Sequence, residues 1–125
     1  ELMGCMRREI KTFFDYESAP YSNMVLGEVL NMPGKWSSYP PHYHPQPEVY
    51  FHRFDHPQGF GASFADGEVY TSKHNGLTVI LNGFHSQVSA PGYAMCYVWG
   101  IRHLPGDPWL WKDDANDHIF ILKEE

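Results

Sequence analysis

The sequence predicts an all-β domain, built as a sandwich or a barrel, and three observations lead to this prediction. Its 125 residues include 11 glycines and 10 prolines, so turns are frequent and long helices are disfavoured. Apolar and aromatic runs recur about every 8 to 15 residues, with turn dipeptides between them. No stretch shows the 3.6-residue periodicity of an amphipathic helix. This length suits one domain with its own core, and we expect residues 1–125 to form it.

The expected strands are short runs rich in β-branched and aromatic residues, most of them bounded by turn residues. An N-terminal strand covers Met6–Phe14, and Val25–Leu30 ends before Met32-Pro33-Gly34. Glu48–Phe54 stops before His56-Pro57-Gln58-Gly59, and Phe60–Ala65 is closed by Asp66-Gly67. Leu77–Leu81 lies between Asn75-Gly76 and Asn82-Gly83, and Tyr93–Trp99 follows Pro91-Gly92. His118–Leu122 is a last apolar run, and residues 113–117 have the composition of a helical turn.

Composition excludes several classes of partner. Nine basic and fifteen acidic residues give a net charge of −6, which argues against a protein that binds nucleic acid or an anionic membrane. No run approaches the ~18 apolar residues that a membrane span needs. Cys5 and Cys96 are the two cysteines, too few and too far apart for a disulfide framework or a metal knuckle. We therefore expect a reducing, cytoplasmic setting.

The proline-rich stretch from Pro40 to Glu48 contains the residues that most clearly indicate a functional site. In extended backbone, side chains alternate between faces, so His42 and His44 point the same way and Glu48 shares their parity. His85 follows the 77–81 strand through a tight glycine turn. Three imidazoles and a carboxylate suit a divalent metal: Zn²⁺ is the first choice, and Mn²⁺, Fe²⁺ and Ni²⁺ fit almost as well. The plain alternative is a pair of histidines that share a solvated strand face by chance.

The remaining histidines carry less weight. Those near turns and charges are expected to be solvated, namely His56, His74 and His118. His52 and His103 are intermediate cases.

These residues resemble the motifs of a known family. Gly34, His42-x-His44, Glu48 and Gly59, followed by Gly83-x-His85, resemble the two metal-binding motifs of the cupin superfamily. Within it, the chain from about Met24 onward resembles the 5-deoxyglucuronate isomerase family of bacterial inositol catabolism. The matching segments are Ser37-Ser38-Tyr39-Pro40-Pro41-His42-x-His44, Glu48-Val49-Tyr50, Pro57-Gln58-Gly59-Phe60-Gly61 and Gly83-Phe84-His85. The related 4-deoxy-5-ketouronate isomerases share several of these elements.

The resemblance implies a cupin jelly-roll barrel, with residues 24–125 as the metal-binding barrel and residues 1–23 as the segment leading into it. Members of this family usually contain two cupin halves, and the chain resembles the C-terminal, metal-bearing half. The implied reaction converts 5-deoxyglucuronate, a sugar acid, into 5-dehydro-2-deoxygluconate. The resemblance also makes His42, His44, Glu48 and His85 the expected metal ligands.

Further residues are candidates for catalysis and substrate binding. His52 and Tyr50 continue the parity of Glu48, so a regular strand aims both inward, His52 as a base and Tyr50 as a hydrogen-bond donor. Packing among aromatic neighbours is the competing interpretation for both. Lys73 and Arg102 are candidates for binding the substrate carboxylate, while Arg53 has the wrong parity. Tyr97 either lines the sugar pocket or packs in the core.

Two other functions remain open at this point: a non-catalytic cupin half that binds a sugar acid or is structural, and an Fe²⁺-dependent, oxygen-using cupin. We also expect a homodimer, because exposed sheet edges and aromatic side chains are usually covered by association. The Met6–Phe14 strand is a candidate to cross between the two protomers.

Overall fold

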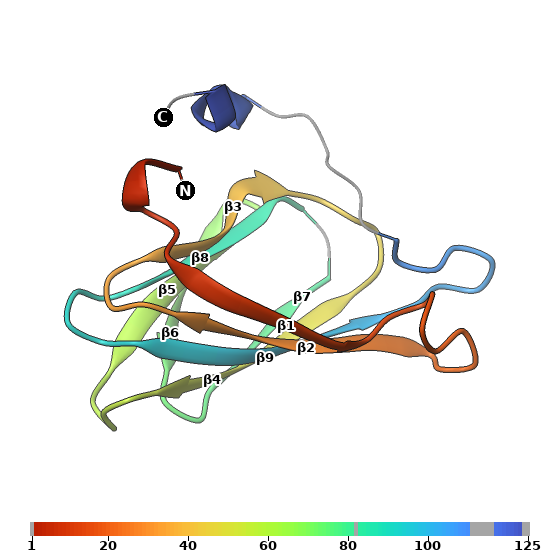
Figure 1. The fold of residues 1–125 in the computed structure, drawn as a ribbon, viewed down its shortest axis with the longest axis horizontal. Coiled ribbons are helices and arrows are strands. Elements are labelled where there is room, and N and C mark those ends of the chain that lie inside the picture. Colours follow the sequence, from red (N-terminus) through yellow and green to blue (C-terminus); the bar gives the residue numbers. More distant parts are fainter. Residues whose placement is uncertain (1, 82, 111–116, 124–125) are drawn as a thin grey trace.

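The structure, a computed structural model, describes residues 2–81, 83–110 and 117–123 as two antiparallel sheets with short 3₁₀ helices near both ends (Figure 1). In chain order the elements are η1 (Leu2–Gly4), β1 (Arg8–Phe14), β2 (Met24–Asn31), β3 (Trp36–His42), β4 (Glu48–Phe54), β5 (Phe60–Ala65), β6 (Glu68–Lys73), β7 (Leu77–Ile80), β8 (His85–Ser89), β9 (Met95–Arg102) and η2 (Ile119–Lys123). One sheet has the order β1-β2-β9-β4-β7 and the other β3-β8-β5-β6. The predicted all-β class is confirmed.

Alternating burial in β4 and β9 builds the core between the sheets. In β4, every second side chain from Glu48 to Phe54 is buried, which confirms the predicted inward face of this strand. In β9, Met95, Tyr97 and Trp99 face inward while the side chains between them are partly exposed. Tyr50 of β4 and Tyr97 of β9 pack edge to face, with ring centroids 5.0 Å apart. The sheet that contains β4 and β9 therefore supplies most of the apolar interior.

Three strands have no counterpart among the predicted ones. β6 is an edge strand with one buried residue, Ser72, so its sequence shows no alternation. β8 is buried but consists largely of polar residues, since its sequence is His-Ser-Gln-Val-Ser. β3 contains two prolines, and its pairing with β8 shifts register between Ser37 and His42. Prolines at edge strands and irregular register are compatible with a sheet but conceal the strand pattern.

The end of the chain corrects one prediction. His118–Leu122, expected as a strand, is instead largely the 3₁₀ helix η2. Ile119 and Leu122 line a cavity inside the barrel, so the apolar run covers the barrel instead of pairing in a sheet. The helical turn expected at residues 113–117 lies mostly outside the described residues.

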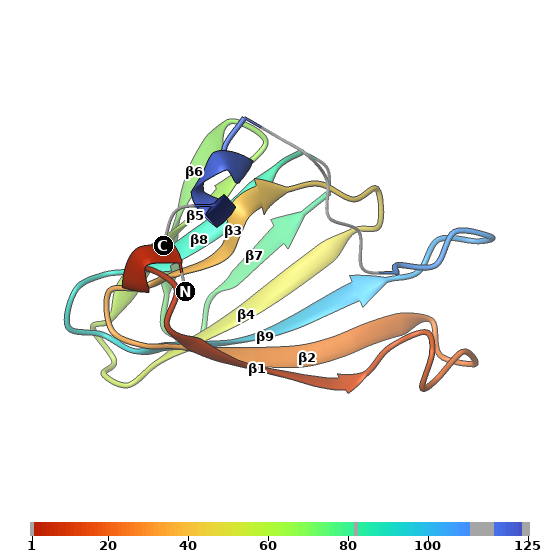
Figure 2. The ribbon, with the colours of Figure 1, turned by 45° about the horizontal axis from the view of Figure 1, so that its top comes forward.

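The two ends of the described chain lie together. Figure 2 shows η1 and η2 beside each other near β3, and residues from both ends surround a second cavity of ≈ 240 Å³. The N-terminal strand β1 pairs with β2, with Arg8 opposite Asn31. Within residues 2–81, 83–110 and 117–123, no helix is long and apolar enough to cross a membrane.

Candidate metal and substrate site

The four predicted metal ligands meet at one end of the barrel, and they come from both sheets. His42 ends β3 and His85 begins β8, and the two are Cα partners in that pairing. Glu48 begins β4 in the opposite sheet, and His44 lies in the segment that crosses between the sheets. The residues from His42 to Glu48 do not form the single extended segment that was expected from their alternation. Their side chains come together because the chain crosses between the sheets here and because β3 pairs with β8.

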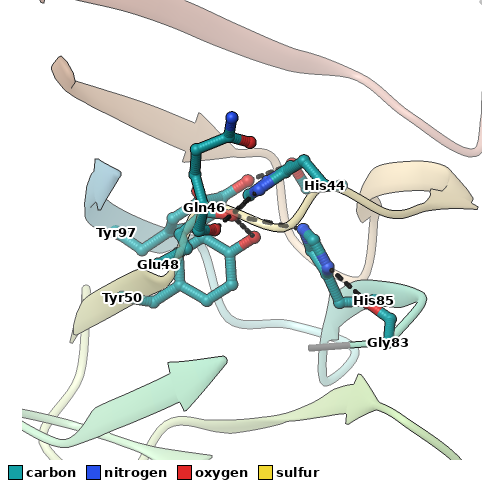
Figure 3. A network of polar contacts seen from close by, with 8 residues as sticks. His44, Gln46, Glu48, Tyr50, Gly83, His85 and Tyr97 are labelled. Atoms are coloured by element: carbon teal, nitrogen blue, oxygen red, sulfur yellow. Dashed lines mark hydrogen bonds and ion pairs between the residues drawn. The ribbon is translucent and has the colours of Figure 1, made fainter. Parts of the chain in front are cut away.

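The imidazoles of His44 and His85 both point toward the carboxylate of Glu48 (Figure 3). The Nε2 atoms of His44 and His85 each lie 3.2 Å from Oε1 of Glu48. One ligand nitrogen from each of His42, His44 and His85 lies within 4.8 Å of the others, a spacing that could hold a metal ion. His44, His85 and Glu48 are buried.

Backbone carbonyls fix how two of the imidazoles are protonated. Nδ1 of His44 donates to the carbonyl of Gln46 at 2.8 Å, and Nδ1 of His85 donates to the carbonyl of Gly83 at 3.3 Å. The Nε2 of each of these two rings is then turned toward Oε1 of Glu48. Such outer partners commonly orient metal-binding histidines. Imidazole nitrogens that converge with a carboxylate oxygen in a buried site are a donor set that divalent metals bind, so these residues fit a metal ion.

The charges of the cluster also suit a cation. Burial, followed by the positive charge that a protonated His85 would carry, lowers the pKa of His42 to about 4. Burial alone would raise the pKa of Glu48, but its contacts with His44 and His85 outweigh this effect, and the pKa is lowered. At neutral pH, His42 is therefore neutral and Glu48 is ionised, which are the protonation states that bind divalent metals.

A glycine positions His85. Gly83 has a φ of +86°, and a Cβ there would lie 2.5 Å from the Cβ of Asp66. Both the left-handed backbone and the close approach favour glycine. This accounts for the Gly83-Phe84-His85 motif, because the carbonyl of the same glycine accepts the hydrogen bond from Nδ1 of His85.

A cavity of ≈ 270 Å³ opens beside the cluster. It is lined by Arg8, Ile10, Val29, Ser38, Tyr39, Pro40, His42, His44, Glu48, Tyr50, Tyr97, Trp99, Ile101, Trp109, Ile119 and Leu122. Its volume is close to the lower end of the ~300–1,000 Å³ typical of small-molecule sites.

Two tyrosines stand between the cluster and the rest of this cavity. The hydroxyl of Tyr50 donates to Oε1 of Glu48 at 3.3 Å. Burial, reinforced by the charge of Glu48, raises the pKa of Tyr50 well above its usual value. Tyr97 shares a hydrogen bond with the hydroxyl of Ser37, and burial raises its pKa as well. Both phenols keep their protons at neutral pH and are available as hydrogen-bond donors.

Three candidate residues do not line the cavity. His52 is fully buried, but its Nε2 pairs with the Thr78 hydroxyl at 3.0 Å, deeper between the sheets. Lys73 and Arg102 are exposed at the ends of β6 and β9. Arg8 does line the cavity, and sequence reasoning missed it. The available indication was its place in the N-terminal strand, two residues before Ile10, so that both share a face.

The other histidines divide as follows. His56 and His118 are exposed, as expected. His74 was expected to be solvated, but it is half-buried and its Nδ1 accepts the backbone N–H of Phe54 at 2.9 Å. His103, an intermediate case, accepts the N–H of Trp109 at 2.9 Å.

Comparison with known proteins places the chain among sugar-acid isomerase relatives. The chain matches the KduI/IolB family over residues 3–121. It is 27% identical over 124 residues to a 5-deoxy-glucuronate isomerase of Geobacillus thermodenitrificans, covering 87% of this chain and 44% of that protein. It is 31% identical over 123 residues to the enzyme of the same name from Bacillus velezensis, covering 86% of this chain and 45% of that protein. The chain thus spans less than half the length of these curated relatives.

Solved structures share the fold. An IolB-like protein from Salmonella typhimurium superposes with a TM-score of 0.81 at 23% identity, over 95% of this chain and 50% of that one. A cupin domain of an XRE family transcriptional regulator from Enterobacter cloacae gives a TM-score of 0.62 at 15% identity, over 78% of this chain and 98% of that one. The two sheets thus form a cupin jelly roll, and with the match over residues 3–121 the chain belongs to the KduI/IolB family.

Proposed function

We propose that this chain holds a divalent metal ion at His42, His44, Glu48 and His85 and isomerises a deoxy sugar acid. The observation that carries the proposal is the convergence of the buried Nε2 atoms of His44 and His85 on the Glu48 carboxylate beside a partly apolar cavity. The relatives named 5-deoxy-glucuronate isomerase supply the substrate, 5-deoxy-glucuronate, and the implied product is 5-dehydro-2-deoxy-gluconate. Neither the non-catalytic nor the oxygen-using alternative gains support from these relatives.

The reaction is an internal oxidation and reduction. The carbon next to the aldehyde loses its C–H and O–H hydrogens and becomes a ketone, while the aldehyde gains one hydrogen on its carbon and one on its oxygen and becomes an alcohol. No external oxidant or reductant is needed. Negative charge develops on the two substrate oxygens as the proton leaves carbon, and a bound divalent ion supplies positive charge beside them.

Residues of the chain supply a hydrogen-bond donor and an apolar lining at the reacting end. Tyr50 retains its proton, and its hydroxyl can turn from Glu48 to donate a hydrogen bond to a substrate oxygen at the reacting end. Trp99, Trp109, and Ile119 and Leu122 of η2 supply apolar parts of the cavity lining. Apolar walls lower the local dielectric constant, which strengthens the electrostatic interactions of a bound ligand. His52 takes no part in the proposed step, because it does not line the cavity.

Elemental analysis and an isomerase assay on the same preparation test this proposal. We expect about one divalent ion per chain, conversion of 5-deoxy-glucuronate, loss of conversion after chelation, and recovery on adding back the metal. Zn²⁺ is the first ion to test, followed by Mn²⁺, Fe²⁺ and Ni²⁺. A metal-loaded chain that consumes oxygen would favour the oxygen-using alternative. One that binds the sugar acid without converting it would favour the non-catalytic alternative.

A further inference from the structure

Arg8 is an unusual residue for its surroundings. It is the one Lys or Arg among the described residues that line the main cavity. Its neighbours there are mostly apolar or aromatic, including Ile10, Val29 and Trp99. A half-buried guanidinium in such a place loses hydration, which is costly unless the charge is paired.

The donors of Arg8 leave room for a further partner. Nη1 donates to the Ser37 hydroxyl at 2.8 Å, and Nε is buried with no hydrogen-bond partner. Among the described residues, no carboxylate forms an ion pair with Arg8. A guanidinium has five N–H donors in a planar fork that matches a carboxylate in two-pronged fashion. Arg8 therefore presents to the cavity a charge without an ion-pair partner among the described residues, together with donors of the right shape.

Arg8 and the histidine cluster are connected across the cavity. The Ser37 hydroxyl that accepts from Arg8 also shares a hydrogen bond with the hydroxyl of Tyr97. Tyr97 packs against Tyr50, whose hydroxyl donates to Glu48. Two phenol rings thus separate the guanidinium from the ligand cluster. A ligand that reaches both ends must carry an anionic group several atoms away from the oxygens that approach the cluster.

We propose that Arg8 binds the carboxylate of the substrate and so fixes which end of a sugar acid meets the histidine cluster. The assignment rests on the proposed function for the identity of the substrate, but the anionic subsite stands on the contacts of Arg8 alone. A sugar acid carries two kinds of oxygen that can approach a metal, its carboxylate and its carbonyl with the neighbouring hydroxyl. Arg8 holds the carboxylate away from the cluster, so the reacting end is presented there. Arg8 takes the role that sequence reasoning gave to Lys73 and Arg102.

Equilibrium binding of two probes tests this assignment without requiring turnover. D-Glucuronate and its uncharged amide, D-glucuronamide, are titrated calorimetrically into the metal-loaded chain. The wild-type chain is expected to prefer the acid. In Arg8→Gln this preference falls by roughly 10- to 100-fold, the range for losing a hydrogen-bonded charge contact, while affinity for the amide is unchanged. Lys11→Gln is the matched control, because Lys11 lies on the same strand with an exposed side chain and pairs with Glu28.

The outcomes separate this inference from the proposed function. A wild-type chain without acid preference, or an Arg8→Gln variant that keeps it, overturns the assignment even if the chain is an isomerase. A chain that binds the acid through Arg8 but converts nothing retains the anionic subsite and refutes the isomerase. If Arg8→Gln does not fold, as judged by circular dichroism, Arg8→Lys replaces it. Lys offers a point charge without the planar fork, so its acid preference must be weaker, and an undiminished preference overturns the two-pronged contact.

Discussion

His42 and His85 face each other as Cα partners across the β3–β8 pairing, with ring centroids 4.5 Å apart. This contact ties the first metal-binding motif to the second within one sheet. Glu48 reaches the same point from the opposite sheet. The cluster therefore depends on how the two sheets close on each other, and an ion bound there would link them.

The first prediction concerns metal affinity. Replacing His42 or His85 by Ala removes one of four ligands, so affinity for Zn²⁺ should fall by more than the ~10–100-fold that loss of an outer hydrogen-bond partner causes. The barrel should still fold, because its apolar core lies mostly between β4, β9 and β2. Competition with a chelating dye measures the affinity, and circular dichroism checks the fold.

The control for this experiment is His56→Ala. His56 is exposed, and the side chains it contacts, Asp55 and Tyr93, are not part of the ligand cluster, so metal affinity should be unchanged. His74 is unsuitable as a control because its imidazole accepts the backbone N–H of Phe54. A His85→Ala protein with undiminished Zn²⁺ affinity would remove His85 from the site.

The second prediction concerns the glycine turn before His85. Gly83→Ala places a Cβ against Asp66 and forces a left-handed backbone on alanine, at a cost of about 1–3 kcal/mol of unfolding free energy. Because His85 is held by the Gly83 carbonyl, Zn²⁺ affinity should fall together with stability. Urea denaturation and metal titration measure the two effects.

Gly92 offers a matched comparison for that variant. Its φ is +88°, close to the +86° of Gly83, but a Cβ there meets no atom within 4 Å. Gly92→Ala should therefore lose some stability from backbone strain while metal affinity stays at the wild-type value. Equal metal affinity in both variants would contradict the role assigned to Gly83.

Alternating burial makes two strands especially clear in the sequence. β4 and β9 show inward and outward positions by residue type, so both were expected with nearly correct limits. β6 and β8 lack this pattern, one because it is an exposed edge and the other because its buried side chains are polar. A polar interior strand carries no hydrophobic periodicity, so residue type alone does not reveal it.

The candidate site divides in a similar way. His42, His44, Glu48 and His85 are close in sequence or tied to a recognisable turn, and they could be named without a structure. Arg8 could not, because it lies 34 residues before His42 and reaches the cavity only through the β1–β2 pairing. His52 shows the opposite failure. Its parity was predicted correctly, but parity fixes a face of the strand and not the depth between the sheets at which the side chain lies.

The third prediction concerns assembly. Val49 and Val79 are Cα partners on the outer face of β4 and β7, and both are exposed, with Leu77 and Leu81 beside them along the sheet edge. Exposed apolar side chains at a sheet edge are usually covered by association, so we predict a homodimer that forms through this face. Light scattering at high protein concentration should give twice the mass of the chain, and Val79→Lys should give the monomer.

Val69 provides the control for the assembly experiment. It lies on β6, an edge strand of the other sheet, and its exposed fraction of 61% matches the 60% of Val79. Val69→Lys should leave the dimer intact. A wild-type protein that scatters with the mass of one chain at all concentrations would defeat this prediction.

The fourth prediction concerns acid stability of the metal-free protein. Burial lowers the pKa of His52 from 6.5 to about 4. Between pH 6.5 and pH 4, His52 is protonated in the unfolded chain and neutral in the folded chain. The free energy of unfolding therefore falls as the pH drops from 6.5 towards 4. One histidine contributes a slope of about 1.4 kcal/mol per pH unit, or about 3 kcal/mol in all. His42, with a similarly lowered pKa, adds a second contribution of the same sign.

His52→Gln isolates the first of these contributions. Glutamine cannot take up a proton. The slope of unfolding free energy against pH should therefore decrease by about 1.4 kcal/mol per pH unit between pH 6.5 and 4. This decrease does not depend on the absolute stability of the variant. Urea denaturation in the presence of a chelator, repeated across this range, gives the slope. An unchanged slope in His52→Gln would mean that His52 is protonated in the folded protein, and its buried contact with Thr78 would then need a different description.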